Sequence, residues 1–206
     1  MIIVGSRSPD FTAEAIVHGV AGIVSLEQYR GQYVLLFFYP ADFSFVCPSE
    51  LHALQRHLPE FHDRHVEVLG VSVDSIHTHL AWLATPVSEG GIAGTTFTLI
   101  SDTSQRLSRA YGVLDEASGA AFRGVFIIDR EGIVQYGSLN TLAFGRSIQE
   151  LLRVIDGIQF TERHGHVCPA NWTPGDLSLT PSVEGQREFL ERSAQSKSEV
   201  SRRGIS

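Results

Sequence analysis

The sequence lacks three features that would place it in large classes of protein: an excess of basic residues, a long apolar run and a cluster of cysteines. Its 16 Lys and Arg are outnumbered by 23 Asp and Glu, for a net charge of -7, so it lacks the basic face that nucleic-acid binding requires. Its longest apolar run, residues 33–39, is far shorter than the roughly 20 residues that span a bilayer. Residues 5–10 are polar where a signal peptide would be apolar. We therefore expect neither a nucleic-acid partner nor a membrane partner, and a cytoplasmic location.

Cysteine is scarce, and the two that occur, Cys47 and Cys168, lie far apart. They cannot form a disulfide framework, a CxxC redox pair or a four-cysteine zinc site. They are therefore either inert core thiols or reactive ones, and their surroundings must decide between the two. Three close histidine pairs invite a metal site, but no cysteine or carboxylate completes a ligand set, so we expect no metal. The pairs are His62/His65, His77/His79 and His164/His166.

Apolar runs and helical stripes alternate along much of the chain. Continuous runs of apolar, strand-favouring residues predict buried strands, and apolar residues spaced three and four apart predict helices. The turn signal Asp129–Gly132 predicts a hairpin. Pro59 should kink or split the first helix, and Asp102 should be the N-cap of the third. The alternation predicts an α/β sandwich with a mixed sheet. The predicted strands are 33–39, 66–73, 97–100, 122–128 and 133–139, and the predicted helices are 49–61, 77–84, 103–111 and 147–160.

Cys47 lies between the first buried strand and the first amphipathic helix. Unpaired N–H groups and the macrodipole at a helix N-terminus favour an anion, and thiolate is the nucleophilic form of cysteine. Pro48 suits the first helical turn, Ser44 can aim its hydroxyl at the sulfur, and Pro40 can shield the pocket from water. A cysteine in such a place can equally be a small buried hydrophobe. Position alone leaves both readings of Cys47 open.

Three stretches resemble the peroxiredoxin family. The pattern Pro-x-x-x-Ser-x-x-Cys over 40–47 resembles the peroxiredoxin active-site motif, which carries Thr or Ser at the place of Ser44. The stretch His164–Trp172, which contains Cys168, is similar to the resolving-cysteine segment of the typical two-cysteine subgroup. Arg123–Asp129 looks like the strand that carries the family's active-site arginine. Several long motifs in the order found in the family identify that family more specifically than any single motif does.

The resemblance covers residues 5–195 and implies a thioredoxin-like fold, in which helices flank a mixed central sheet and an extended C-terminal arm follows. It divides the chain into three parts. Residues 1–160 would form the thioredoxin-like domain and residues 161–192 the resolving-cysteine segment. Residues 193–206 are rich in Ser and Arg and are expected to be a disordered tail.

The resemblance also implies a thiol-dependent peroxidase that reduces hydrogen peroxide and organic hydroperoxides. Cys47 would attack the peroxide and become a sulfenic acid, and Cys168 of the other subunit of a head-to-tail homodimer would condense with it. Five such dimers would assemble into a ring. Thioredoxin or a flavoprotein disulfide reductase would restore the thiols by exchange. No cofactor is needed within this chain.

Five further residues receive roles from the resemblance. Arg123 would favour the thiolate and contact the peroxide, Ser44 would hydrogen-bond substrate and sulfur, and Pro40 would shield the site. Glu50 would hold the Arg123 guanidinium, and Arg146 is a weaker candidate for the same neighbourhood. Read without the motif, the arginine would be a surface charge, the glutamate would complement a helix dipole, and the serine would be a helix cap.

Two departures from the family pattern concern over-oxidation. Easily over-oxidised members carry Gly-Gly-Leu-Gly and a C-terminal Tyr-Phe pair, which brace the closed site. Here the stretch that matches Gly-Gly-Leu-Gly is Gly90–Gly94, which is one residue longer, and the pair that matches Tyr-Phe is Phe189-Leu190. Both changes predict looser bracing of the closed site, and therefore intermediate-to-robust resistance to sulfinic acid formation. Two rival functions use the same thiols: an oligomeric holdase or redox relay, and a thioredoxin-type reductase, which the missing CxxC disfavours.

Overall fold

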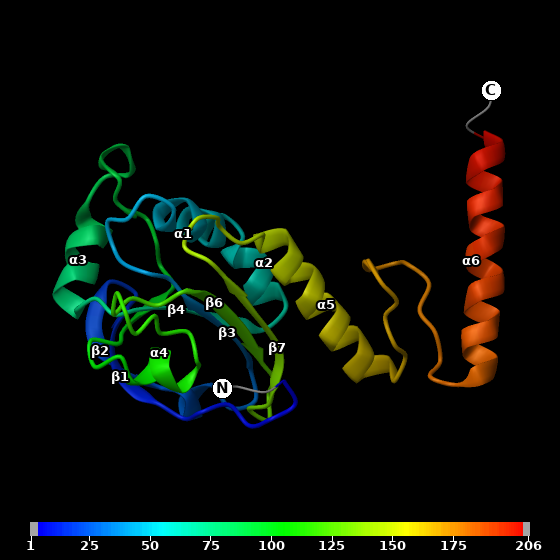
Figure 1. Ribbon diagram of the computed structural model, residues 1–206, viewed down its shortest axis with the longest axis horizontal. Helices are drawn as coiled ribbons and strands as arrows, with labels where there is room; N and C mark the ends of the chain where they lie inside the picture. The colour runs from blue at the N-terminus through cyan, green and yellow to red at the C-terminus, as the bar shows by residue number, and fades with distance from the viewer. Residues whose placement is uncertain (1–3, 204–206) are drawn as a thin grey trace. The chain divides into compact units, whose positions relative to one another are not determined.

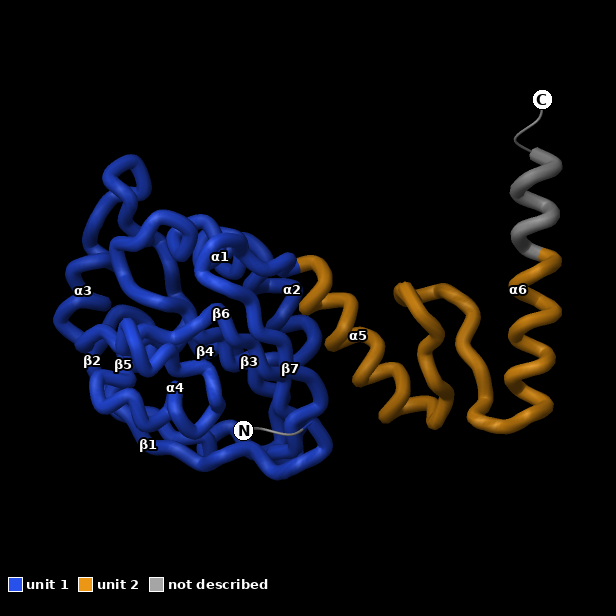
Figure 2. The backbone as a smooth tube through the Cα atoms, in the orientation of Figure 1, with its two compact units in different colours: residues 1–148 blue, residues 149–206 orange. Residues whose placement is uncertain are grey.

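The computed structural model describes the backbone of residues 4–203 and the side chains of residues 4–195. It divides into two compact units, Met1–Ile148 and Gln149–Ser206, coloured separately in Figure 2. No helix among the described residues is long and apolar enough to cross a membrane. The division falls at the start of a long helix that ends at His164, whereas the sequence-based division between residues 160 and 161 falls inside that helix. The functional division of the chain stays a prediction.

The first unit is built on a seven-stranded sheet with the order β2-β1-β5-β4-β3-β6-β7 (Figure 1). The pairs β3–β4 and β4–β5 are parallel and the others are antiparallel, so the predicted mixed sheet is confirmed. The predicted hairpin is also confirmed, because β6 and β7 pair across the turn at 129–132. The strands are β1 (Thr12–Val17), β2 (Val20–Ser25), β3 (Tyr33–Phe38), β4 (Val66–Ser72), β5 (Thr98–Ser101), β6 (Arg123–Ile128) and β7 (Val134–Asn140).

The interior strand β3 fixes the position of the loop that leads to Cys47. All six of its residues are buried, as expected for a strand covered on both faces. Leu36 pairs in parallel with Leu69 of β4 and in antiparallel with Phe126 of β6. Tyr39 and Pro40 follow, so the loop that leads to Cys47 leaves the sheet at the carboxyl end of its parallel strands, where α/β proteins bind ligands.

Helices surround this sheet. The predicted effect of Pro59 is confirmed, because α1 ends at Arg56 and α2 begins at Leu58 with the proline in its first turn. The α-helices of the first unit are α1 (Cys47–Arg56), α2 (Leu58–Asp63), α3 (Ile76–Ala84) and α4 (Arg106–Ala110), and the 3-10 helices are η1 (Leu26–Tyr29) and η2 (Val87–Glu89).

Two local features differ from the sequence-based expectation. Helix α4 begins at Arg106 with Gln105 as its N-cap in the left-handed region (φ 57°), so Asp102 is not the cap. The Asp102 carboxylate instead accepts the backbone N–H groups of Leu107 and Ser108 from one turn outside the helix. The hairpin of β1 and β2 was not predicted, because exposed positions break its apolar alternation. Its two-residue turn at 18–19 has positive φ at both positions, which is the geometry that twisted hairpins prefer.

The second unit contains two helices and the segment that joins them. Helix α5 (Ile148–His164) begins where predicted but continues beyond Phe160, and α6 (Val183–Arg203) follows the joining segment. An isolated bridge between Val167 and Leu179 makes that segment a narrow loop. The tail predicted to be disordered, 193–206, overlaps the end of α6 and continues outside the described residues, so its disorder stays a prediction.

Candidate active site

Cys47 is the first residue of α1 and is fully buried. Val46 precedes it as the N-cap, and Pro48 lies in the first turn, where its missing N–H is not needed. The N–H groups of Ser49 and Glu50 bond to the Val46 carbonyl, which closes the first turn next to the sulfur. The predicted location at a helix N-terminus is confirmed, and it favours an anion at this sulfur.

Arg123 brings a fixed positive charge to the sulfur. Its guanidinium is almost completely buried at the start of β6, and Nη1 donates to Cys47 Sγ at 3.2 Å and to Glu50 Oε2 at 2.7 Å. Nε and Nη2 both donate to the Leu142 carbonyl, at 3.1 and 3.0 Å. A planar guanidinium held on two sides cannot swing away from the sulfur, so it is preorganised for a negative charge there.

Arg146 lies at the centre of the site. It donates to Glu50 three times, from its backbone N–H at 2.8 Å, from Nε at 2.9 Å and from Nη2 at 3.0 Å. Its Nη1 donates to the carbonyls of Phe38 and Gly124, both at 2.7 Å, and its guanidinium carbon lies 3.3 Å from the centre of the Phe37 ring. The sequence made this residue only a weak candidate for the site, because the partners of an arginine in a loop are set by the fold and not by its neighbours in the sequence.

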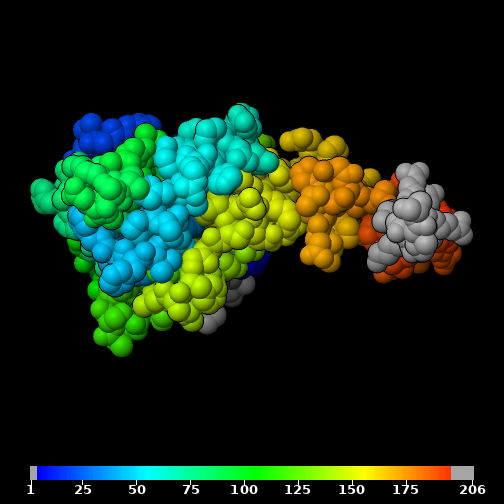
Figure 3. Space-filling model, turned by 90° about the horizontal axis from the view of Figure 1, so that it is seen from above, coloured from blue at the N-terminus to red at the C-terminus, as the bar shows by residue number. Residues whose placement is uncertain are grey.

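Two guanidinium groups and one carboxylate leave this buried cluster with one positive charge in excess, which a thiolate at Cys47 would balance. Burial by itself raises the pKa of Glu50, but the hydrogen bonds and charge of Arg146 and the charge of Arg123 together lower it. Glu50 therefore stays ionised, and it orients both arginines. Figure 3 shows that the segments around 40–60, which supplies Cys47 and Glu50, and around 140–148, which supplies Arg146, lie next to one another on one face of the first unit.

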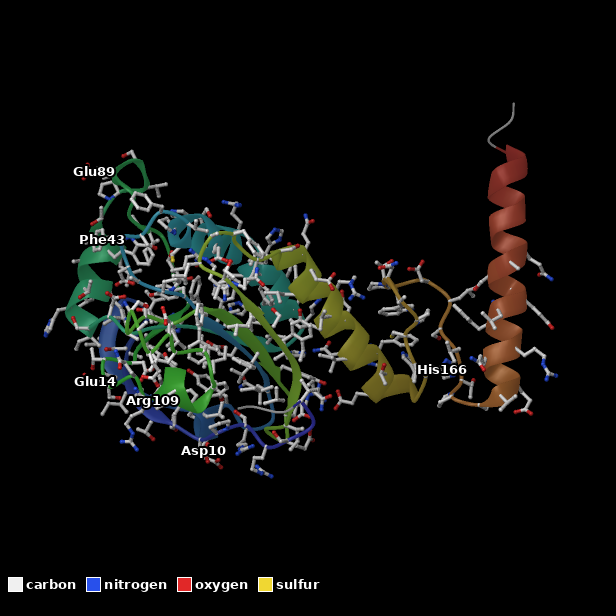
Figure 4. All side chains as sticks on the ribbon, viewed as in Figure 1. Asp10, Glu14, Phe43, Glu89, Arg109 and His166 are labelled. Carbon is white, nitrogen blue, oxygen red and sulfur yellow. The ribbon has the colours of Figure 1, made fainter. Side chains whose placement is uncertain are left out.

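Pro40 and Ser44 occupy the loop between β3 and α1. Pro40 is buried two residues beyond the end of β3, and Ser44 is half-buried. The Ser44 hydroxyl donates to the Ala41 carbonyl at 2.9 Å. The lone pairs of the hydroxyl oxygen are therefore available to accept a hydrogen bond from a peroxide. Phe43, at a positive φ of 53°, turns the loop toward α3 and lies 5.9 Å from the ring of Trp82 (Figure 4). The roles of Pro40 and Ser44 in substrate binding stay predictions.

Cys168 has very different surroundings in the second unit. It is half-buried in the loop after α5, and its sulfur lies 3.7 Å from both the Gly157 carbonyl and the Thr161 hydroxyl. No hydrogen bond to a charged group is found for it among the described residues. The loop is held instead by stacking, because the rings of Phe160 and Trp172 are 4.7 Å apart, and by Arg153, which donates to the Trp172 carbonyl at 2.9 Å.

The histidine pairs do not assemble into a metal site within residues 4–195. No group of three His, Cys, Asp or Glu in that part of the chain is placed to hold an ion. His164 and His166 instead pack against Phe160, the first tilted and the second edge-on, with ring centroids 4.6 and 6.5 Å away. His79 is fully buried beside Asp42, a partner that the sequence gave no reason to expect.

The segments of the chain that match known protein families include both cysteines. The AhpC/TSA family matches residues 4–137, and the C-terminal domain of 1-Cys peroxiredoxin matches residues 157–192. Peroxiredoxin-2 of Bos taurus is 47% identical over 189 residues, which is 92% of this chain and 95% of that protein. Thioredoxin peroxidase of Echinococcus granulosus is 47% identical over 188 residues, which is 91% of this chain and 97% of that protein. The reduced 2-Cys peroxiredoxin of Plasmodium vivax has a TM-score of 0.89 at 49% identity, covering 91% of this chain and 98% of that chain.

Proposed function

Since the chain belongs to the AhpC/TSA family of peroxiredoxins, we propose that it is a thiol peroxidase that reduces hydrogen peroxide and organic hydroperoxides at Cys47. The single observation that carries this proposal is the Arg123 guanidinium, which donates to the Cys47 sulfur and to Glu50 from the same nitrogen. A buried cation fixed against a buried sulfur stabilises the thiolate and also any negative charge that develops nearby.

The first step is a displacement at oxygen. The Cys47 thiolate attacks the terminal oxygen of ROOH, an S–O bond forms and the O–O bond breaks. The leaving RO⁻ takes a proton to become ROH, and the cysteine is left as sulfenic acid, the first step of sulfur oxidation. The negative charge moves from sulfur to the leaving oxygen during this step, so donors fixed around both atoms lower the barrier. Arg123 supplies such donors, the Ser44 hydroxyl accepts a hydrogen bond from the peroxide, and Pro40 limits the access of water.

The second step joins the two cysteines. The Cys168 thiol condenses with the sulfenic acid, an S–S bond forms and water leaves. We infer that the thiol comes from a second copy of the chain in a head-to-tail homodimer, and that five such dimers form a ring. The Cys47 sulfur is fully buried, so the first turn of α1 must open before another sulfur can reach it.

Reduction of the disulfide completes the cycle. An external dithiol attacks one sulfur and is oxidised to a disulfide, while both protein thiols are restored. We propose thioredoxin, or a flavoprotein disulfide reductase, as the donor, and the Echinococcus relative named a thioredoxin peroxidase supports the former. The sulfur chemistry requires no metal or organic cofactor in this chain.

A test of this proposal uses the fact that the chain has two cysteines, so each variant leaves one thiol. Wild type, Cys47→Ser and Cys168→Ser are treated with peroxide and examined on non-reducing gels, and peroxide consumption is measured with a thioredoxin system. Wild type should turn over and form a covalent dimer. Cys168→Ser should consume one equivalent to form the sulfenic acid, and further peroxide only by over-oxidation, without forming the disulfide. Cys47→Ser should consume none.

Mixing the two variants tests the intersubunit bond. Neither forms the disulfide alone, but a mixed dimer pairs Cys47 of one chain with Cys168 of the other, so a covalent dimer should reappear after subunit exchange. Peroxide turnover by Cys47→Ser would contradict the assignment of the nucleophile. An oxidised wild type that migrates as a monomer with an internal disulfide would contradict the intersubunit step. Suppression of client aggregation without peroxide turnover would favour the holdase instead.

A further inference from the structure

A half-buried histidine attaches helix α1 to the stretch of chain before β5, and the peroxidase chemistry above does not use it. His52 Nε2 lies 3.1 Å from the Gly91 carbonyl oxygen. A carbonyl can only accept, so this nitrogen carries the hydrogen and donates it. His52 belongs to the second turn of α1, directly after the turn that begins with Cys47. The bond therefore joins that second turn to the stretch at 90–94.

The acceptor of this hydrogen bond lies on a well-fixed part of the chain. The Trp82 side chain is completely buried, and its indole N–H donates to the Gly90 carbonyl at 2.9 Å. The backbone N–H of Gly91 itself donates to the Pro86 carbonyl at 3.0 Å. Because these bonds hold the Gly91 carbonyl in place, a movement of the second turn of α1 away from it would break the bond from His52.

A second pair of hydrogen bonds attaches α1 to the same stretch further along the helix. The backbone N–H of Thr96 donates to Gln55 Oε1 at 2.9 Å, and Gln55 Nε2 donates to Thr96 Oγ1 at 3.1 Å. Gln55 is one turn after His52 and next to Arg56, where the helix ends. Two side chains thus attach α1 to one stretch of chain, the first in its second turn and the other near its end.

The opening of α1 gives the two attachments different consequences. The disulfide proposed above requires the first turn to unwind, because the Cys47 sulfur is fully buried. The carbonyls of the first turn accept the N–H groups of the second, so unwinding leaves those N–H groups without acceptors. Leu51, at the start of the second turn, is completely buried, and an unpaired N–H costs more there than one hydrogen bond contributes. The start of the second turn therefore has to lift toward water, and the bond from His52 to Gly91 resists this movement.

Resting on the proposed peroxidase function, we propose that His52 is a positioning residue that holds the second turn of α1 on the Gly91 carbonyl and thereby slows the opening that precedes the disulfide. While the helix is closed, the reactive sulfur keeps its contact with Arg123, so His52 does not affect the attack on peroxide. It acts on the second step, in which Cys168 has to reach Cys47. A chain without this bond should open more often and form the disulfide faster.

Three substitutions in α1 test this assignment. His52→Leu removes the donor and leaves a good helix former at the position. Glutamine places its amide nitrogen near the position of Nε2, so His52→Gln keeps a donor for the Gly91 carbonyl. Gln55→Leu is the matched control, because it removes the other attachment of the same helix to the same stretch. Urea unfolding of each variant shows that it is folded before its kinetics are compared.

Stopped-flow tryptophan fluorescence follows both steps, because Trp82 lies against Phe43 of the loop between β3 and α1. The first phase, the reaction with peroxide, should stay within about 2-fold of wild type in all three variants. The second phase, disulfide formation, should be about 5-fold faster in His52→Leu, as expected for one lost hydrogen bond. In His52→Gln and Gln55→Leu it should stay within about 2-fold of wild type. An unchanged second phase in His52→Leu, an equal acceleration in Gln55→Leu, or a slower first phase in His52→Leu would overturn the proposal.

Hydrogen exchange of the reduced protein gives a second readout, which does not depend on activity. The amides of Leu51 and Ala53 lose their acceptors when α1 opens, so they should exchange about 5-fold faster in His52→Leu than in wild type. The amide of His57, which donates to the Ala53 carbonyl at the end of the helix, should exchange at an unchanged rate. In wild type alone, Leu51 should exchange faster than His57, and equal rates would contradict an opening limited to the start of α1. A wild type that consumes no peroxide but shows these exchange rates would refute the peroxidase function and leave the attachment at His52 standing.

Discussion

The two cysteines of this chain lie in opposite kinds of environment. Cys47 is fully buried, 3.2 Å from a guanidinium that a carboxylate and a carbonyl hold in place. Cys168 is half-buried, and its polar neighbours are a carbonyl and a hydroxyl, each 3.7 Å away. The first sulfur has a short contact with a charged group, and the second has two long contacts with neutral groups.

This contrast agrees with the role proposed for each sulfur. In the proposed mechanism charge develops at Cys47 during the attack on peroxide, and fixed donors lower that barrier only if they are in place beforehand. Cys168 would travel to another sulfur in the proposed second step, so strong contacts would slow it by the energy needed to break them. The loop around it is accordingly held by ring stacking and one arginine, which contact the backbone and the rings rather than the sulfur. The predictions below test this division of roles.

The largest effect should come from Arg123→Gln. Glutamine removes the fixed charge at the Cys47 sulfur, so the rate constant for peroxide should fall by about 10²–10³-fold, as when one preorganised donor is lost. Arg123→Lys keeps the charge but cannot bond the sulfur, Glu50 and the Leu142 carbonyl together, so it should recover only part of the rate. Stopped-flow fluorescence measures both. The matched control is Arg109→Gln, an exposed arginine paired with Glu116. Equal losses in control and test would rule out a special role for Arg123.

Glu50→Gln should give the largest loss of stability. It leaves two buried guanidinium groups without their shared carboxylate, and breaking a buried ion pair from one side costs about 3–5 kcal/mol. The free energy of unfolding is measured in urea at one fixed protein concentration, because self-association would add to stability. The control Glu116→Gln breaks an exposed pair and should leave the midpoint unchanged within error. A Glu50→Gln variant as stable as wild type would mean that the cluster does not depend on its carboxylate.

The same carboxylate should make the first unit sensitive to acid. The pKa of Glu50 is below its ordinary value of 4.5 in the folded protein, despite burial, because of Arg146 and Arg123. A carboxylate with a lowered pKa contributes stability that is complete above its ordinary value and is lost as the pH falls through the folded value. The stability difference between wild type and Glu50→Gln should therefore be constant near neutral pH and shrink below pH 4.5. Urea unfolding at a series of pH values measures it, and a difference that grew in acid would have the wrong sign.

Over-oxidation tests how quickly Cys168 reaches Cys47. The stretch at 90–94 is longer than in easily inactivated relatives, and Leu190, at the place of an aromatic residue, is 59% exposed. We expect Cys47 to remain free of sulfinic acid at low micromolar peroxide and to form it only at much higher concentration. Mass spectrometry of the Cys47 peptide across a peroxide titration, with the thioredoxin system present, measures this. Cys168→Ser is the control, because it cannot resolve the sulfenic acid and should form sulfinic acid at the lower concentrations. Sulfinic acid in wild type at low micromolar peroxide would refute the prediction.

The sequence was sufficient to predict the fold, but it predicted few of the contacts that single side chains make. The thioredoxin-like sandwich is confirmed, because runs such as 33–39 and the split at Pro59 are local signals. Arg146 and His79 have no comparable signal, since their partners Glu50 and Asp42 lie far away in the sequence and become neighbours only when loops pack against helices α1 and α3. The β1–β2 hairpin was missed because its strands are largely exposed and lack a regular apolar alternation.

The smallest effect should come from Thr161→Val, which removes the hydroxyl near Cys168 at almost constant volume. A contact of 3.7 Å to a sulfur is at the long limit of hydrogen bonding, so its loss should change the rate of disulfide formation by about 2-fold or less. The rate is measured as the second fluorescence phase after a peroxide pulse, while the first phase, which reports on Cys47, should be unchanged. A 10-fold change in the second phase would show that Thr161 activates the Cys168 thiol, and that the second sulfur, like the first, depends on a preorganised partner.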